Sequence, residues 1–119
     1  MEGVDGINKR ETGTQYEKVA AEFLRGKGYN ILMQNYYCRY GEIDIIAEEN
    51  GYTVFIEVKY RKNTVSGSPE SAVNSIKIQH IRKAALDFIT SSYGTEEIPC
   101  RFDIVAITGN QIHLIKDAF

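Results

Sequence analysis

The fold of this chain is decided by two apolar segments, Gly41-Glu42-Ile43-Asp44-Ile45-Ile46-Ala47 and Phe55-Ile56-Glu57-Val58-Lys59-Tyr60-Arg61. Both have the residue pattern of β-strands, but acids and a lysine occupy positions that a purely structural strand fills with Val, Thr or Ile. Between the two segments lies Asn50-Gly51, a strong signal for a two-residue hairpin turn. We therefore predict an antiparallel β-hairpin with unusual polar side chains.

A two-residue turn also fixes the register of this hairpin. Glu49 then faces Tyr52, so that paired residue numbers sum to 101 and Asp44 lies opposite Glu57. Directly opposed side chains share a face, with Cβ atoms roughly 4.5–5.5 Å apart, and like charges placed there are destabilising. The two opposed carboxylates therefore favour binding of a cation, which is the reason to expect a metal site.

Other turn lengths would change this pairing. A four-residue turn places Asp44 opposite Phe55, with Glu57 diagonal to it, and the two acids still share a face. A three-residue turn flips one strand and separates them. The two-residue turn additionally places Glu42 opposite Lys59.

The two faces of the predicted hairpin differ in character. The apolar face is expected to be core, and it consists of Ile43, Ile45, Val54, Ile56, Val58 and Tyr60. The mixed face consists of Glu42, Asp44, Ile46, Phe55, Glu57, Lys59 and Arg61. Because this second face is half apolar, we expect it to be covered at one end and open at the other, with the acids at the mouth.

Composition and length favour one globular domain. The chain has 119 residues, of which 43% are hydrophobic and 25% charged, and no apolar run approaches the ~20 residues that span a membrane. We expect residues 1–10 to be a flexible tail and residues 11–119 to be a single domain. The N-terminus lacks the apolar region of a secretory signal and the two cysteines are isolated, so a reducing cytoplasm is the expected location.

Hydrophobic periodicity predicts the element order αβββαββ, an α/β domain with a mixed sheet flanked by helices. The first helix is expected from near Thr12 to Gly26–Gly28, with the apolar stripe Tyr16, Val19, Ala20, Phe23 and Leu24. Between this helix and the hairpin we expect a short strand at 29–33 and an aromatic connection at 35–40. After the hairpin we expect a helix at about 69–92, which starts at Ser68-Pro69 and has a break near Asn74-Ser75. A loop at 91–99, a strand at 101–108, a turn at Gly109-Asn110 and a strand at 111–115 are expected to follow.

The acids and the lysine of the hairpin predict metal-assisted phosphodiester hydrolysis. Carboxylates bind hard divalent cations through oxygen, and a metal so held can activate water and polarise a phosphoryl group. Lys59 lies two residues after Glu57, hence on the same face, where an ammonium can orient water or stabilise transition-state charge. The structural alternative is a cross-strand ion network, Glu42 with Lys59 and Glu57 with Arg61, worth ~0–1 kcal/mol per exposed pair.

Two further acids, Glu17 and Asp103, have different expected roles. Glu17 lies at the edge of the apolar stripe of the first helix and could reach the sheet as a third acid of the site. Alternatively, Thr14-x-x-Glu17 is a capping box that uses Glu17 at the helix N-terminus; if Thr12 caps the helix instead, Glu17 is free. Asp103, in Arg101-Phe102-Asp103, is expected to pair with a neighbouring basic side chain.

Several short motifs together resemble the YraN family. They are Gly13-x-x-x-Glu17-x-x-Ala20, Gly28-Tyr29, the two hairpin segments, Lys77, and Arg101-Phe102-Asp103. This small, largely uncharacterised bacterial family is similar to archaeal Holliday-junction resolvases within the PD-(D/E)XK nuclease superfamily. The resemblance covers nearly all of the chain after the tail, and the hairpin segments at this spacing are its most specific part.

The resemblance implies a restriction-endonuclease-like core. It also implies that Asp44 and Glu57 bind Mg²⁺ or Mn²⁺, that Lys59 is the catalytic lysine, and that Glu17 is a helix-borne acid that helps to bind metal or water. The proline of the PD motif is replaced here by Ile43.

From these patterns we expect a metal-dependent endonuclease that acts on DNA, with branched or junction DNA as the analogous substrate. Arg61, Lys62 and Lys77 are the candidates for contact with the nucleic acid, and a homodimer is expected by analogy with the resolvases. The alternative is a nucleic-acid-binding or assembly module with a vestigial site. The acidic pI and the small size of the domain favour this alternative, since a lone domain has little surface with which to grip a duplex. The net charge of −2 argues mildly against a nucleic-acid binder, because such domains are usually basic.

Overall fold

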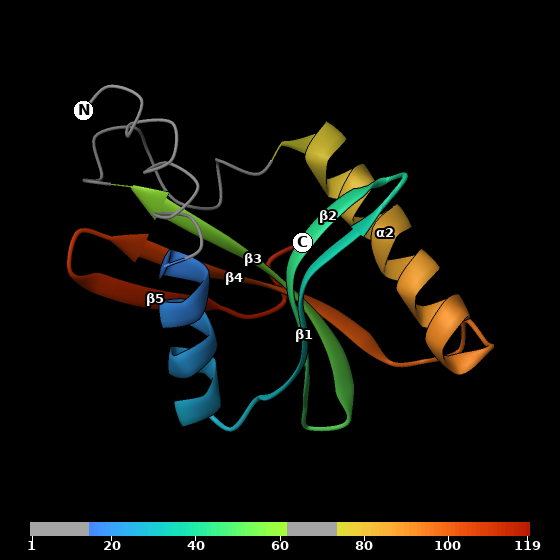
Figure 1. Ribbon diagram of the computed structural model, residues 1–119, viewed down its shortest axis with the longest axis horizontal. Coiled ribbons are helices and arrows are strands. Elements are labelled where there is room, and N and C mark those ends of the chain that lie inside the picture. Colours follow the sequence, from blue (N-terminus) through green and yellow to red (C-terminus); the bar gives the residue numbers. More distant parts are fainter. Residues whose placement is uncertain (1–14, 62–73) are drawn as a thin grey trace.

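The computed structural model describes residues 15–61 and 74–119, which form a five-stranded mixed sheet between two helices (Figure 1). The strand order is β1-β2-β3-β4-β5, and β3 and β4 are parallel whereas the other neighbours are antiparallel. The elements are a helix over residues 15–26, β1 (Asn30–Cys38), β2 (Gly41–Glu49), β3 (Tyr52–Arg61), α2 (Ser75–Tyr93), β4 (Cys100–Thr108) and β5 (Gln111–Ile115). This confirms the order αβββαββ and is compatible with a restriction-endonuclease-like core.

Some expectations concern residues outside the described ranges. These are the tail at 1–10, the helix start at Ser68-Pro69, the capping candidates Thr12 and Thr14, and Lys62.

The start of α2 is set by its N-cap. The side chain of Asn74 accepts a hydrogen bond of 2.9 Å from the backbone N–H of Lys77, as a capping residue does. The expected break near Asn74-Ser75 is therefore the place where α2 begins. At the other end, the N–H of Gly94 bonds to the carbonyl of Thr90, and Gly94 has the positive φ (74°) that ends many helices.

The two helices cover opposite faces of the sheet, and each encloses its own core. The helix over 15–26 packs Ala20, Ala21 and Leu24 against the face formed by Ile45, Ala47, Val54, Ile56, Val105 and Ile107. The other face packs against α2, through Ile43, Ile46, Phe55, Ile104 and Ala106 of the sheet and Ile81, Ala84, Ala85, Phe88 and Ile89 of the helix. In the described part of the chain, no helix is both long and apolar enough to cross a membrane.

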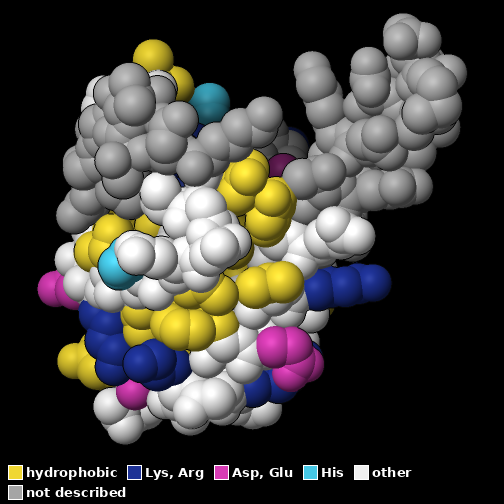
Figure 2. Space-filling view, turned by 90° about the vertical axis from the view of Figure 1, so that its left-hand side faces the viewer, with side chains coloured by type: hydrophobic (Ala, Val, Ile, Leu, Met, Phe, Trp, Pro, Cys, Tyr) yellow, Lys and Arg dark blue, Asp and Glu magenta, His cyan; other side chains and the backbone are white. Residues whose placement is uncertain are grey.

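The first helix leaves part of its side of the molecule uncovered. Val19, expected in the buried stripe, is 44% exposed, because Ala20, Ala21 and Leu24 are the residues that meet the sheet. The ring of Tyr60 stacks on that of Tyr16 with centroids 3.9 Å apart and remains partly exposed. Figure 2 shows this side of the molecule, where hydrophobic side chains gather beside Lys and Arg side chains.

The register predicted for the hairpin of β2 and β3 is confirmed over its paired residues, and the expected pair of Asp44 with Glu57 lies one step beyond them. Glu49 pairs with Tyr52, and the turn residues Asn50 and Gly51 have φ values of 54° and 83°, as a two-residue turn of type I′ requires. The paired residues of this ladder run only as far as Ile45 and Ile56. Beyond that point β2 parts from β3, and Figure 1 shows the hairpin of β1 and β2 curving toward α2.

This divergence corrects two expectations. Glu42 was expected opposite Lys59, but it pairs with Tyr37 of β1, because β2 has already left β3. Ile43 was expected on the face of Ile45, but it packs with Ile46 on the side of α2. Both differences follow from an irregularity of β2 at Asp44.

The first strand is longer than expected. The predicted aromatic connection at 35–40 is mostly strand, since β1 runs from Asn30 to Cys38 and pairs with β2 up to Gly41. Its pairing skips Asn35, which would face Asp44 and has a positive φ of 58°. The irregularities of the two strands therefore lie opposite each other.

Candidate active site

Asp44 and Glu57 meet where β2 parts from β3. Oδ2 of Asp44 accepts a hydrogen bond of 2.8 Å from the backbone N–H of Val58, a group that β2 would otherwise bond through its backbone. The carboxyl groups of Asp44 and Glu57 lie close enough to form a hydrogen bond when one of them carries a proton. The side chain of Glu57 is only 4% exposed, whereas Asp44 is half-buried.

The electrostatics of this pair disfavour two negative charges. Burial, the charge of Glu57 and the hydrogen bond with Glu57 raise the pKa of Asp44 to about 8, although the N–H of Val58 acts in the opposite direction. Such a pair retains a proton near neutral pH when nothing else neutralises it. A divalent cation would remove the repulsion that holds this proton.

Two lysines lie beside the same oxygen atom of Glu57. Nζ of Lys59 lies 3.4 Å from Oε2, and Lys77 of α2 forms a second ion pair with that atom. Burial and the neighbouring Lys77 lower the pKa of Lys59. The ion network expected here paired Glu42 with Lys59 and Glu57 with Arg61. In the structure, Glu57 is instead paired with both Lys59 and Lys77.

Glu17 approaches the acids from the first helix. Its side chain is hydrogen-bonded to Asn35, and burial together with the charges of Glu42 and Glu57 raises its pKa although Asn35 lowers it. Glu17 also acts on the charge of Asp44. Glu17 therefore lies in the electric field of the pair, but residues 15–61 and 74–119 contain no group of three or more acids, histidines or cysteines placed to hold one metal ion.

With this geometry established, the sequence was compared with known proteins. Residues 16–107 match the family described as "Uncharacterised protein family UPF0102". The chain belongs to this family. UPF0102 is the YraN family, so the resemblance seen in the motifs is confirmed.

Relatives in the UPF0102 family align over almost the whole chain. A UPF0102 protein of Lachnoclostridium phytofermentans is 47% identical over 113 residues, which cover 95% of this chain and 96% of the relative. A UPF0102 protein of Saccharophagus degradans is 43% identical and covers 92% of both chains. A UPF0102 protein of Thermodesulfovibrio yellowstonii is 44% identical and covers 92% of this chain and 96% of the relative.

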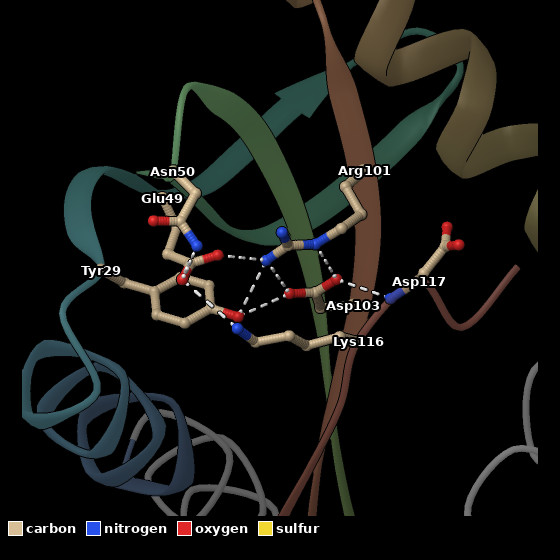
Figure 3. Close-up of polar contacts among 7 residues, drawn as sticks. All are labelled: Tyr29, Glu49, Asn50, Arg101, Asp103, Lys116 and Asp117. Atoms are coloured by element: carbon tan, nitrogen blue, oxygen red, sulfur yellow. Dashed lines mark hydrogen bonds and ion pairs between the residues drawn. The ribbon is translucent and has the colours of Figure 1, made fainter.

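A second polar cluster in this UPF0102 chain lies on the face of the first helix (Figure 3). Arg101 makes a two-pronged contact with Asp103, in which both nitrogen–oxygen distances are 2.9 Å. Tyr29 donates a hydrogen bond of 2.7 Å to Asp103, and Arg101 also reaches Glu49 at 2.8 Å. The expected pairing of Asp103 with a basic neighbour is confirmed. Every oxygen of the fully buried Asp103 is bonded. The cluster joins β4 to β2 through Glu49 and to Tyr29, which lies between the first helix and β1.

Sequence reasoning missed Asn35 as a member of the candidate site. Its signal was an asparagine inside an otherwise apolar and aromatic strand, since asparagine is poor in strands but tolerates positive φ. Its hydrogen bond orients Glu17, and its backbone turns β1 where β2 turns at Asp44.

Of the expected nucleic-acid contacts, Arg61 and Lys77 fall within the described residues. Arg61 is the last residue of β3 and is half-buried, whereas Lys77 is engaged with Glu57. Two open cavities, of about 510 and 320 Å³, are lined by other residues, so neither includes Asp44, Glu57 or Lys59. The candidate site is the fork between β2 and β3, where Asp44, Glu57 and Lys59 lie.

Proposed function

We propose that this protein is a divalent-metal-dependent endonuclease that hydrolyses phosphodiester bonds of DNA, with Mg²⁺ or Mn²⁺ as cofactor. The observation that carries the proposal is the buried contact between the carboxyl groups of Asp44 and Glu57, with the ammonium of Lys59 at 3.4 Å from Glu57. Two acids and a lysine at such a fork are the groups that this chemistry needs. Membership of the UPF0102 family is compatible with the proposal and names no activity.

The residues at the fork fit a magnesium or manganese ion in donor type. Both acids offer oxygen, and among the described residues Oε2 of Glu57 is a buried atom without a hydrogen-bond partner of good geometry. Mg²⁺ typically takes one or two protein carboxylates and completes its shell with water and substrate phosphate. Asp44 and Glu57 would hold the ion, which would activate water and polarise the phosphoryl group.

The protein's own groups would position the reacting atoms. The N–H of Val58 fixes the orientation of the Asp44 carboxylate. The ammonium of Lys59 lies at the same fork, 3.4 Å from Glu57, and would orient water or stabilise negative charge that develops on phosphate. Glu17, oriented by Asn35, adds negative field at the edge of the fork.

A second candidate function is a nucleic-acid-binding module with a vestigial site. One observation favours it: Lys59 and Lys77 already neutralise Glu57 without any metal. In that case the cations of the fork would be permanent structural partners of the acid. Salt-dependent DNA binding that no divalent cation converts into cleavage would support this function.

Cleavage of labelled DNA distinguishes the two functions. Linear, flapped and four-way DNA are incubated with the protein and Mg²⁺ or Mn²⁺, and with Glu57→Gln and Lys59→Met variants. We expect metal-dependent cleavage by the wild type and a loss of at least ~100-fold in both variants. The control is Glu48→Gln, which removes an exposed carboxylate from the same hairpin and should leave the rate unchanged. Cleavage that persists in Glu57→Gln would refute the proposal.

A further inference from the structure

Of the three charged residues in this ion network, Lys77 is the most exposed to solvent. Its side chain is 41% exposed, whereas those of Lys59 and Glu57 are 22% and 4% exposed. Lys77 is attached to α2 and reaches across to Oε2 of Glu57, whereas Lys59 lies on the same strand as Glu57. The long and flexible side chain of Lys77 can thus move away from the acid without any change in the sheet.

The helix itself gives Lys77 no favourable partner. Lys77 lies in the first turn of α2, where the positive end of the helix dipole favours acids and disfavours cations. This first turn contains no acidic residue. Within residues 15–61 and 74–119, the acid that forms an ion pair with Lys77 is Glu57.

A metal ion and Lys77 would compete for the same atom. An ion held between Asp44 and Glu57 uses the oxygen atoms of both, and Oε2 of Glu57 is the atom to which Lys77 is paired. Lys59 also lies beside this atom, so a divalent ion would be a third cation there, and the repulsion is strong because the local dielectric constant is low. Lys77 is the more exposed of the two lysines and comes from another element, so it is the one that can move away. Binding of the metal thus requires that Lys77 leaves.

We propose that Lys77 is an exchangeable counter-ion, which neutralises Glu57 in the metal-free protein and is displaced by the divalent cation. This inference rests on the proposed function, since it takes Asp44 and Glu57 as the metal ligands. The displaced ammonium remains tethered at the mouth of the fork, where its charge is complementary to a phosphate of the substrate. Lys77 then pairs with Glu57 in the metal-free site and with a substrate phosphate in the metal-bound site.

The exchange predicts that removal of Lys77 strengthens metal binding. In Lys77→Met the side chain keeps its length but no longer competes, so Mn²⁺ should bind about fivefold more tightly, corresponding to the loss of one partly exposed ion pair. The cap of α2 is kept, because Asn74 bonds to the backbone N–H of residue 77. Lys77→Arg keeps the competing charge and should bind Mn²⁺ no more tightly than the wild type.

The test is a titration of the metal-free full-length protein with Mn²⁺ in the absence of DNA. The electron paramagnetic resonance signal of free Mn²⁺ gives the dissociation constant for the wild type, Lys77→Met, Lys77→Arg and the control Lys83→Met. Lys83 lies on the same helix and lines a separate cavity, so its removal should not alter the affinity. Tighter binding by Lys77→Met alone is the expected result.

Two outcomes overturn the inference and differ in what they mean for the proposed function. If Lys77→Met binds Mn²⁺ as the wild type does or more weakly, and Glu57→Gln abolishes binding, the metal site stands and the exchange does not occur. If Mn²⁺ binds none of these proteins, or binds Glu57→Gln equally well, Lys77 is a permanent partner of Glu57 and the metal site itself is refuted.

Discussion

The backbone N–H of Val58 donates a hydrogen bond of 2.8 Å to the side chain of Asp44 on the neighbouring strand. Paired residues of β2 and β3 extend only to Ile45 and Ile56, so this side chain takes the place of the next backbone acceptor. The bond closes the end of the ladder and at the same time fixes a carboxylate beside Glu57. One local irregularity thus produces both the fork of the sheet and the pair of acids.

The buried acid pair should make stability depend on pH in metal-free buffer. The unfolded chain loses the proton of Asp44 near pH 3.8, whereas the folded protein holds it up to about pH 8. Between these values the folded state binds more protons, so its stability falls as pH rises, on the order of 1 kcal/mol per pH unit. Asp44→Asn keeps an acceptor for Val58 and should lose this decline.

Urea unfolding at pH 5 and pH 8, with a chelator present, measures the effect as the difference between Asp44→Asn and the wild type. Glu48→Gln is the matched control, because Glu48 is an exposed acid of the same strand. An Asp44→Asn protein that loses as much stability as the wild type between the two pH values would show that Asp44 is already ionised at pH 5.

Asn35 should be replaceable by glycine more easily than by alanine. Its φ of 58° costs a residue with a Cβ roughly 1–2 kcal/mol, and glycine has no such cost. Asn35→Gly still removes the hydrogen bond that lowers the pKa of Glu17, so that pKa should rise. Urea unfolding compares the two variants, and carboxyl NMR titration follows Glu17. Equal stability of the alanine and glycine variants would show that the backbone relaxes at this position.

Glu17 should assist the site without being indispensable. It is half-buried and bonded to Asn35, and it does not complete a three-residue ligand group. Glu17→Gln keeps a similar shape and removes the charge, so cleavage should fall roughly 10- to 100-fold, as for residues that orient or tune metal ligands. Single-turnover cleavage with Mn²⁺ measures this loss. A loss as complete as that of Glu57→Gln would mean that Glu17 is itself a ligand.

The cluster around Asp103 should contribute to stability and not to chemistry. Asp103→Ala leaves the half-buried Arg101 without its main partner and should cost about 3–5 kcal/mol, whereas Tyr29→Phe removes one hydrogen bond and should cost about 1 kcal/mol. Glu22→Ala breaks an exposed pair with Arg25 and should cost less than ~1 kcal/mol. Urea unfolding gives all three values. A mild effect of Asp103→Ala would show that the cluster is not needed for folding.

Local sequence signals were sufficient for the regular part of the hairpin. Asn50 and Gly51 both accept positive φ, so the turn and therefore the pairing of Glu49 with Tyr52 could be predicted. Alternation along β3 also placed Glu57 and Lys59 on one face. The position of these residues in the site follows from such short-range rules.

The fork itself could not be predicted from the sequence. Alternation assumes a regular strand, and it therefore placed Ile43 with Ile45 and Glu42 opposite Lys59. In the structure, pairing of β2 with β3 ends at Ile45 and Ile56, and Ile43 and Ile46 pack against α2. Asn35 signals an irregular strand locally, but the direction of the bend depends on contacts with a helix more than 30 residues away in the chain.

Anomalous diffraction from crystals soaked in Mn²⁺ tests the central claim most directly, since it locates the ion and the competing lysine together. The account predicts a manganese peak in contact with the carboxylates of Asp44 and Glu57, with Nζ of Lys77 moved off Glu57. A fork without manganese, with Lys77 still paired to Glu57 at saturating Mn²⁺, would contradict it.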